Sequence, residues 1–323
     1  MSLVTRLVLA VGIASIGLSS LAQDSSVRLN KAIELLENDS PAFGLLSFDY
    51  SLNNARSLSR SGLDFIIIDM EHAPFDVEKL RLFLLGMTDK RTIAEKGNLQ
   101  PDVIPIVRIP ATGKENFLAQ AKQVLDVGAF GVMYPSISTR EEAELAVRAT
   151  RYPQLKGAQD YEPNGLRGRN PANAIWYWGV TDYYAKADVW PLDLAGELLA
   201  VIQIETEQGV KNIDDILSVP GISVIFIGPS DLSADMGYAS AAAPEVEAAI
   251  QTVLESCLEN AVACAITTNQ NTIERRLQEG FRFVTLGLDG GLSERASEAL
   301  RRGREASGRD DVESDAVPNS APY

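Results

Sequence analysis

Eight short apolar runs, separated from one another by helical patterns, constrain the fold of this chain more than any other feature. The run Phe-Ile-Ile-Ile-Asp at 65–69 is rich in β-branched residues and has no polar alternation, which is typical of a parallel strand buried on both faces. Strands that alternate with helices form a parallel sheet, and eight such units close into a barrel. The sequence therefore predicts an α/β fold, a (β/α)8 TIM barrel in a single domain. The predicted strands are 43–48, 65–69, 103–108, 130–134, 199–205, 223–228, 262–267 and 281–286.

Helix-boundary residues lie between these runs and support the alternation. Three Thr or Asn residues are followed three positions later by Glu, as in the capping box that begins many helices, while a proline and a glycine suit a helix start and a helix end. A doubly wound open sheet is the alternative, but no Gly-x-Gly-x-x-Gly turn follows the first predicted strand. The boundary residues are Thr112 with Glu115, Thr139 with Glu142, Asn271 with Glu274, Pro244 and Gly280.

Both ends of the chain differ from the predicted barrel. A short basic start, an apolar stretch at 7–18 and a small-x-small pattern ending at Ala22 predict a signal peptide over 1–22, with an uncleaved anchor as the alternative. We therefore expect an exported protein, periplasmic or secreted, without membrane attachment after cleavage. The barrel and an N-terminal helix are expected over 23–302, and the acidic, polar residues 303–323 predict a disordered tail.

Composition limits the possible partners. The chain is 46% hydrophobic and 23% charged, as in ordinary globular proteins, and its net charge of −15 argues against a nucleic-acid partner because such binding needs a concentrated basic face. An acidic protein acting on an anionic substrate needs a local positive charge, from an arginine or a metal. Cys257 and Cys264 are too few for a metal framework; we expect buried thiols, with oxidation in an exported protein as the alternative.

The segment 153–197 interrupts the alternation and contains all three tryptophans. Connections this long in compact domains are usually functional or interfacial, and a Trp/Tyr-rich one fits a lid or a subunit contact. A loop packed against its own barrel is the alternative.

Charged residues gather at the predicted C-terminal ends of the strands, the end at which barrels carry their active sites. Glu205 and Asp231, with no cysteine and no second histidine in the group, suit a hard divalent cation such as Mg²⁺ or Mn²⁺ rather than zinc. Taken singly, each charged residue has another explanation: a helix cap, a turn residue or a surface charge. The group comprises Asp69, Glu71, the chain's only histidine His72, Arg108, Glu205 and Asp231.

Six motifs occur in an order shared with a known family. They are Asp69-Met70-Glu71-His72-Ala73-Pro74, Pro105-Ile106-Val107-Arg108, Lys122-Gln123-Val124-Leu125-Asp126-Val127-Gly128, Arg151-Tyr152-Pro153, Gln203-Ile204-Glu205 and Gly228-Pro229-Ser230-Asp231-Leu232-Ser233. In these motifs the chain resembles the HpcH/HpaI class II (metal-dependent) pyruvate aldolases, from about residue 44 to residue 289. The resemblance implies the same barrel and a homo-oligomer, a trimer or a hexamer.

The resemblance also implies roles for individual residues. The metal ligands would be Glu205 and Asp231, the acid/base residue His72, and the carbonyl-binding cation Arg108. The substrate pocket would include Gln203, Gly228, Pro229 and Ser230.

Asp126 matches the carboxylate that pairs with the catalytic histidine in this family. The helix that carries Asp126 should run back towards the bottom of the barrel, so Asp126 would meet His72 only from a neighbouring subunit. A solvated aspartate at a helix end is the alternative.

The implied activity is an aldolase that cleaves or forms 4-hydroxy-2-oxo acids through a metal-stabilised pyruvate enolate, with a small 2-oxo acid and an aldehyde as partners. A Schiff-base route needs a lysine at a strand end, and no predicted strand end carries one. Two alternatives stay open: a lyase for CoA-thioester acids, of the citrate-lyase or malyl-CoA-lyase type, and an exported protein that binds metal and oxo acid without turnover.

Overall fold

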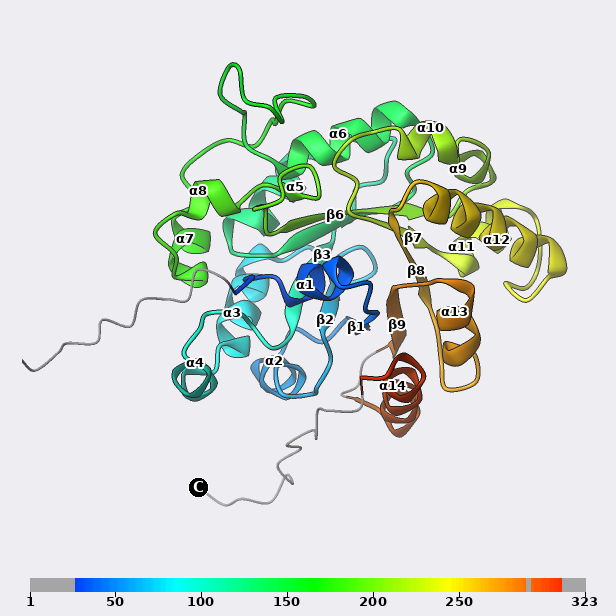
Figure 1. Ribbon diagram of the computed structural model, residues 1–323, viewed down its shortest axis with the longest axis horizontal. Coiled ribbons are helices and arrows are strands. Elements are labelled where there is room, and N and C mark those ends of the chain that lie inside the picture. The colour runs from blue at the N-terminus through cyan, green and yellow to red at the C-terminus, as the bar shows by residue number, and fades with distance from the viewer. Residues whose placement is uncertain (1–26, 289–291, 310–323) are drawn as a thin grey trace, which may run out of the picture.

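The computed structural model describes residues 27–288 and 292–309, which form one closed parallel barrel with helices around it (Figure 1). Pairing of β4 with β6 closes the ring, and the two-residue β5 (Val189–Trp190) pairs with β6 outside it. The predicted barrel is confirmed, and the open-sheet alternative is wrong. The barrel strands are β1 (Ala42–Ser47), β2 (Phe65–Asp69), β3 (Ile104–Arg108), β4 (Gly131–Tyr134), β6 (Leu198–Ile204), β7 (Val224–Ile227), β8 (Ala263–Thr267) and β9 (Phe283–Leu288).

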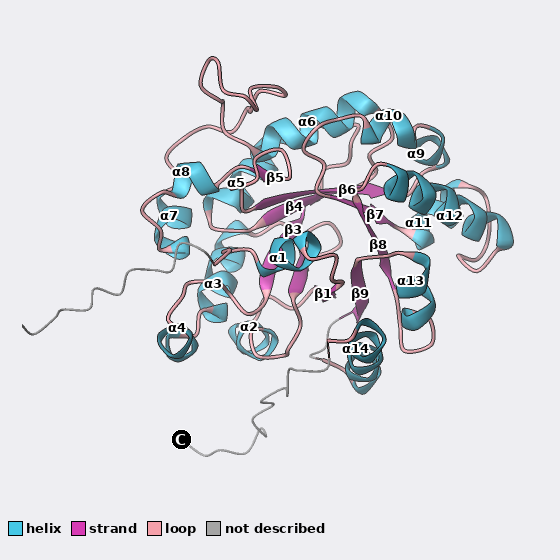
Figure 2. Ribbon diagram, in the orientation of Figure 1, coloured by secondary structure: helices cyan, strands magenta, loops and turns pink. Residues whose placement is uncertain are grey.

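Helices cover the outside of the barrel, so that most strands are buried on both faces (Figure 2). Every residue of β2 is buried, as expected for a strand with side chains inside and helices outside. The helices are α1 (Lys31–Glu37), α2 (Leu52–Leu58), α3 (Val77–Met87), α4 (Lys90–Lys96), α5 (Leu118–Asp126), α6 (Arg140–Thr150), α7 (Ala172–Trp178), α8 (Tyr183–Lys186), α9 (Glu207–Lys211), α10 (Ile213–Leu217), α11 (Pro229–Asp235), α12 (Pro244–Glu259), α13 (Ile273–Glu279) and α14 (Glu294–Ser307).

The helix-boundary predictions are mostly confirmed. Thr139 forms a complete capping box at α6, Pro244 is at the first turn of α12, and Gly280 ends α13 in the left-handed conformation. The start predicted at Thr112 is wrong, because α5 begins only at Leu118. The predicted start of α13 is one residue early, since the N-cap is Thr272.

The aromatic segment 153–197 packs largely on its own barrel, in agreement with the alternative given above. Trp178 is buried, stacks on Phe130 with ring centroids 4.4 Å apart, and donates its indole N–H to the carbonyl of Gly128 at 2.9 Å. Trp176, by contrast, is 72% exposed, and Leu155, Leu166, Tyr184 and Leu194 of the same segment are exposed as well.

The C-terminal boundary predicted at 303 is wrong, because α14 continues to Ser307. Arg309 then donates to both carboxylate oxygens of Asp64, which lies directly before β2. The predicted signal peptide and the tail residues 310–323 lie outside the described residues. Among the residues described, no helix is both long and apolar enough to span a bilayer.

Cys257 on α12 and Cys264 on β8 are buried free thiols, as predicted. Their Sγ atoms lie only 2.7 Å apart. The two side chains face each other because α12 packs directly on β8.

Candidate active site

The C-terminal ends of β2 and β3 bring an aspartate and an arginine together. Asp69 and Arg108 end neighbouring strands and face each other in the strand register. Arg108 donates Nε to Asp69 Oδ1 at 3.1 Å and Nη2 to Oδ2, and Oδ1 also accepts the backbone N–H groups of Glu71 and His72. Burial raises the pKa of Asp69, but Arg108 and these N–H donors outweigh it and hold the pKa below its ordinary value. Asp69 is therefore a charged, fixed acceptor.

His72 lies above this buried pair, and its side chain is 56% exposed. Its Nδ1 is 3.2 Å from Asp69 Oδ2 and 3.0 Å from Arg108 Nη2. If the imidazole carries its proton on Nδ1 and donates it to Asp69, the lone pair of Nε2 is available as a base.

Glu71 has a different environment from Asp69. Its carboxylate lies 3.1 Å from Arg108 Nη1 and 3.7 Å from His72 Nδ1. Burial raises its pKa to about 7; the charge of Arg108 opposes this rise and that of Glu205 adds to it. The sequence placed Glu71 at this mouth but assigned it no role.

Glu205 directly follows β6 and is 4% exposed. Its Oε1 accepts the backbone N–H of Ser136 at 2.9 Å and the Ser136 hydroxyl at 2.6 Å, while Oε2 accepts from Gln203 Nε2. Burial raises the pKa of Glu205, the Ser136 hydroxyl lowers it, and the negative charge of Asp231 raises it further. Asp231 is exposed in the first turn of α11. The negative charge of Asp231 thus acts on Glu205, the other carboxylate predicted to bind metal.

The surroundings of Glu205 suit a hard divalent cation. Glu205 and Asp231 offer carboxylate oxygens to a metal, and Mg²⁺ and Mn²⁺ prefer oxygen ligands. A Cβ on Gly228 would lie 2.7 Å from Glu205 Oε2, so only glycine permits this close approach. Within the described part of the chain, the buried Oε1 of Gln203 has no hydrogen-bond partner, and it is therefore free to accept from a metal-bound water or a substrate.

A second group of possible ligands fits a cation less well. Ligand atoms of Asp69, Glu71 and His72 lie within 4.8 Å of one another. The guanidinium of Arg108 already bonds to Asp69 and pairs with Glu71, so an added cation there would be repelled.

Asp126 is the last residue of α5. In the described part of the chain it forms no hydrogen bond or ion pair with His72. It pairs with the buried Arg167 at 3.0 Å and with Lys122. Among the remaining predicted pocket residues, Pro229 begins α11 and Ser230 is exposed beside Asp231.

Sequence reasoning missed Ser136 altogether. It lies in the connection between β4 and α6, where nothing in the local pattern marks it. Its partner Glu205 is 69 residues away, so only the fold shows the contact.

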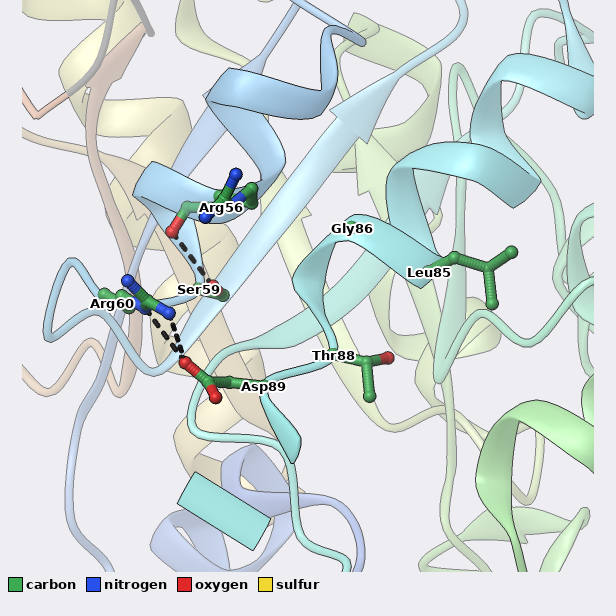
Figure 3. Close-up of a pocket in the computed structure, with 7 residues that line it drawn as sticks. All are labelled: Arg56, Ser59, Arg60, Leu85, Gly86, Thr88 and Asp89. Carbon is green, nitrogen blue, oxygen red and sulfur yellow. Dashed lines mark hydrogen bonds and ion pairs between the residues drawn. The ribbon is translucent and has the colours of Figure 1, made fainter. Parts of the chain in front are cut away.

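A pocket of about 310 Å³ lies away from these residues, between α2 and the end of α3 (Figure 3). Arg60 points to Asp89 across it and forms an ion pair. This pocket shares no residue with the mouth of the barrel, so no catalytic role is assigned to it. Its lining is Arg56, Ser59, Arg60, Leu85, Gly86, Thr88 and Asp89.

The chain is similar to known aldolases over most of its length. The family model described as HpcH/HpaI aldolase/citrate lyase matches residues 49–296. A 4-hydroxy-2-oxo-heptane-1,7-dioate aldolase of Shigella boydii serotype 18 is 38% identical over 267 residues, covering 80% of this chain and 89% of that protein. The protein of the same name from Klebsiella pneumoniae is 36% identical over 271 residues, covering 83% of this chain and 91% of its own.

A solved structure agrees. An HpcH/HpaI aldolase/citrate lyase family protein from Burkholderia cenocepacia J2315 superposes with a TM-score of 0.67 at 30% identity, and the match covers 86% of this chain and 97% of that one. Fold and sequence therefore give the same relationship.

These relatives contradict the predicted export. They are bacterial aldolases matched over 89% and 91% of their length, and they give no indication of an export signal. Our prediction rested on hydropathy at 1–22, a compositional signal that other apolar segments share. The alternative of an exported, non-catalytic binding protein is wrong with it.

The predicted enzyme class, an aldolase and so a carbon–carbon lyase, is confirmed by the same relatives. The CoA-thioester lyase is a lesser fit, because the similar proteins named above are aldolases of 4-hydroxy-2-oxo acids. The chain therefore belongs to the HpcH/HpaI aldolase/citrate lyase family.

Proposed function

We propose that this aldolase cleaves and forms 4-hydroxy-2-oxo acids at the mouth of the barrel where β2, β3, β6 and β7 end. The observation that carries the proposal is the placement of two carboxylates, the buried Glu205 directly after β6 and Asp231 in the first turn of α11 after β7, at the same end of the barrel as His72. The names of the relatives suggest 4-hydroxy-2-oxo-heptane-1,7-dioate as the first substrate to test.

The proposed cofactor is Mg²⁺ or Mn²⁺, held by Glu205 and Asp231. When bound, such a cation supplies positive charge that stabilises the enolate of a 2-oxo acid. Gln203 and the segment Gly228-Pro229-Ser230 would line the pocket beside it. The glycine at 228 supports this assignment, because it lets the chain approach the Glu205 carboxylate.

The proposed base is His72. In cleavage the C3–C4 bond breaks, its electron pair stays with the C3 fragment as the enolate of pyruvate, and the C4 hydroxyl loses its proton to become the aldehyde carbonyl. Nε2 of His72 accepts that proton when Nδ1–H is donated to Asp69. The protonated Nε2 then gives the proton to C3 of the enolate, and pyruvate leaves. With pyruvate alone, the same nitrogen removes a methyl proton from C3 and returns one that has exchanged with solvent. In the direction of synthesis it carries the proton from C3 of pyruvate to the oxygen of the aldehyde.

Arg108 is proposed to hold the keto or aldehyde oxygen. Its guanidinium is fixed by Asp69 and Glu71, and its side chain is 7% exposed. Because the two carboxylates orient the planar donor in advance, little reorganisation is needed when the oxygen gains negative charge.

Exchange of the methyl protons of pyruvate with deuterium tests the proposal, because the exchange reports enolate formation without an aldehyde. We expect exchange by the native chain that requires Mg²⁺ or Mn²⁺ and falls by about 100-fold or more in His72→Ala. Ser59→Ala is the matched control, because Ser59 lines the pocket between α2 and the end of α3 and not the mouth of the barrel. We expect this variant to keep the native exchange rate.

Two outcomes contradict the proposal. One is pyruvate binding with no exchange in the native chain. The other is cleavage of 4-hydroxy-2-oxo-heptane-1,7-dioate only when CoA is present, which supports the lyase instead.

We also propose a homo-oligomer, a trimer or a hexamer, in which Asp126 serves His72 of a neighbouring subunit. In support, the Asp126 carboxylate is held at the surface by Arg167 and Lys122, and its side chain is 20% exposed. A carboxylate fixed in this way is accessible to another chain.

A further inference from the structure

Ser136 gives two hydrogen bonds to one oxygen of Glu205. The backbone N–H reaches Glu205 Oε1 at 2.9 Å and the hydroxyl reaches the same atom at 2.6 Å. The other oxygen, Oε2, accepts from Gln203 Nε2. The carboxylate therefore cannot rotate without losing bonds at both oxygens.

The backbone at Ser136 is held in an uncommon conformation to make these bonds. Its φ is +53°, in the left-handed region that non-glycine residues rarely adopt. Bonds on either side fix it: Gly113 N–H donates to the Pro135 carbonyl at 3.1 Å, and Ile137 N–H donates to the Gln203 carbonyl at 3.1 Å. Strain of this kind persists only where the surrounding structure enforces it, and it is concentrated at functional sites.

We propose that Ser136 is a positioning residue for the cation site, and that its hydroxyl sets the affinity of Glu205 for the divalent ion. The inference rests on the proposed function. Ser136 supplies both bonds to Oε1, so Oε2, which lies on the side of Gly228 and accepts one bond from Gln203, keeps a second lone pair for a cation. Removing a partner that orients a metal ligand typically weakens metal binding by about 10- to 100-fold.

Titration of the metal-free chain with Mn²⁺, followed by the electron paramagnetic resonance signal of free Mn²⁺, tests the inference. Ser136→Ala removes the hydroxyl but keeps the N–H, and we expect its Kd to rise about 10-fold. Ser136→Gly also lacks the hydroxyl, but glycine adopts positive φ without strain. If its Kd for Mn²⁺ rises as much as that of Ser136→Ala while its melting temperature stays unchanged, the lost affinity is due to the missing hydroxyl and not to backbone strain.

Ser138→Ala is the matched control. Ser138 lies two positions further along the same connection, and its hydroxyl bonds to Thr206 Oγ1 at 2.7 Å instead of to Glu205. We expect its Mn²⁺ affinity to stay at the native value.

The outcomes separate this inference from the proposed function. If the native chain does not bind Mn²⁺, or if Glu205→Gln binds it as tightly as the native chain, the proposed metal site is wrong. Two other results would contradict the role of Ser136 and leave the metal site in place. In the first, Glu205→Gln no longer binds Mn²⁺ but Ser136→Ala binds it with native affinity. In the second, Ser138→Ala loses as much Mn²⁺ affinity as Ser136→Ala.

Discussion

Asp69 and Glu71 lie two positions apart after the same strand, yet their environments shift their pKa values in opposite directions. Asp69 accepts two bonds from Arg108 and two from backbone N–H groups, so its pKa is lowered despite burial. Glu71 is partly buried without comparable donors, and its pKa is raised to about 7. One carboxylate is thus a fixed charge that orients Arg108 and His72, whereas the other changes charge near neutral pH.

This difference predicts a pH dependence of stability for the metal-free protein. Folded Glu71 holds its proton up to about pH 7, whereas an unfolded glutamate releases it near pH 4.5. The folded state binds more protons between these values, so the contribution of Glu71 to stability falls as the pH rises through them. We expect the melting temperature of Glu71→Gln to fall less than that of the native chain over this range.

Thermal unfolding at steps from pH 4.5 to about 7 checks this expectation. Glu255→Gln, on the exposed side of α12, is the control and should follow the native curve. Parallel curves for Glu71→Gln and the native chain would show that Glu71 titrates normally.

At the scale of elements, the capping-box pattern of Thr followed three positions later by Glu begins a helix at one place in the chain and not at another. Thr139 and Thr112 are both followed three positions later by Glu, but only Thr139 begins a helix. At Thr112 only half of the box forms, with its N–H donated to Glu115 Oε2 at 3.0 Å. Gly113 packs so closely on the Ser136 carbonyl that an added Cβ would lie 2.9 Å from it. Tertiary packing of this connection therefore overrides the helix signal.

The capping difference predicts different costs for the same substitution. Thr139→Ala removes the side-chain acceptor for the Glu142 N–H, and we expect the free energy of unfolding to fall by about 1 kcal/mol. Thr112→Ala removes no helix cap and should change it by less than about 0.5 kcal/mol. Urea unfolding of the two variants measures both values, and equal losses would mean that the capping box contributes nothing at α6.

At the scale of the whole molecule, barrel closure gathers residues that are far apart in the chain. Arg108 and Glu205 are separated by almost a hundred positions, yet both follow strands that end at one mouth. Asp126 is at the end of α5 instead and is bonded to Arg167 and Lys122. Its proposed pairing with His72 therefore requires a second chain.

Mixing two inactive variants tests that requirement. Asp126→Ala and His72→Ala each lose the exchange reaction alone, but an assembly of both contains some sites with native His72 from one chain and native Asp126 from the other. We expect mixed assemblies to regain part of the exchange rate. Analytical ultracentrifugation of the same samples gives the mass of the assemblies.

The mixture of His72→Ala with Glu205→Gln is the control, because each of these variants inactivates its own chain's site. It should regain nothing. A monomeric native chain, or no gain in the first mixture, would contradict a shared site.

Much of the fold and part of the site follow from local sequence. Apolar runs of strand length, separated by helical patterns, indicate a parallel sheet, and eight such units favour a barrel, which brings the ends of its strands to one mouth. The positions of Asp69, Arg108, Glu205 and Asp231 at that mouth could therefore be predicted, since the first three end or directly follow a recognisable run and Asp231 lies in the first turn after one.

Other features are long-range contacts, and they leave no periodic signal in the chain. Ser136 on Glu205, Arg167 on Asp126 and Arg309 on Asp64 each join segments that are 41 to 245 residues apart. Local sequence determines which elements form, because backbone preference and periodicity are local properties. Only the tertiary structure decides which polar side chains meet, because those bonds depend on how distant elements pack.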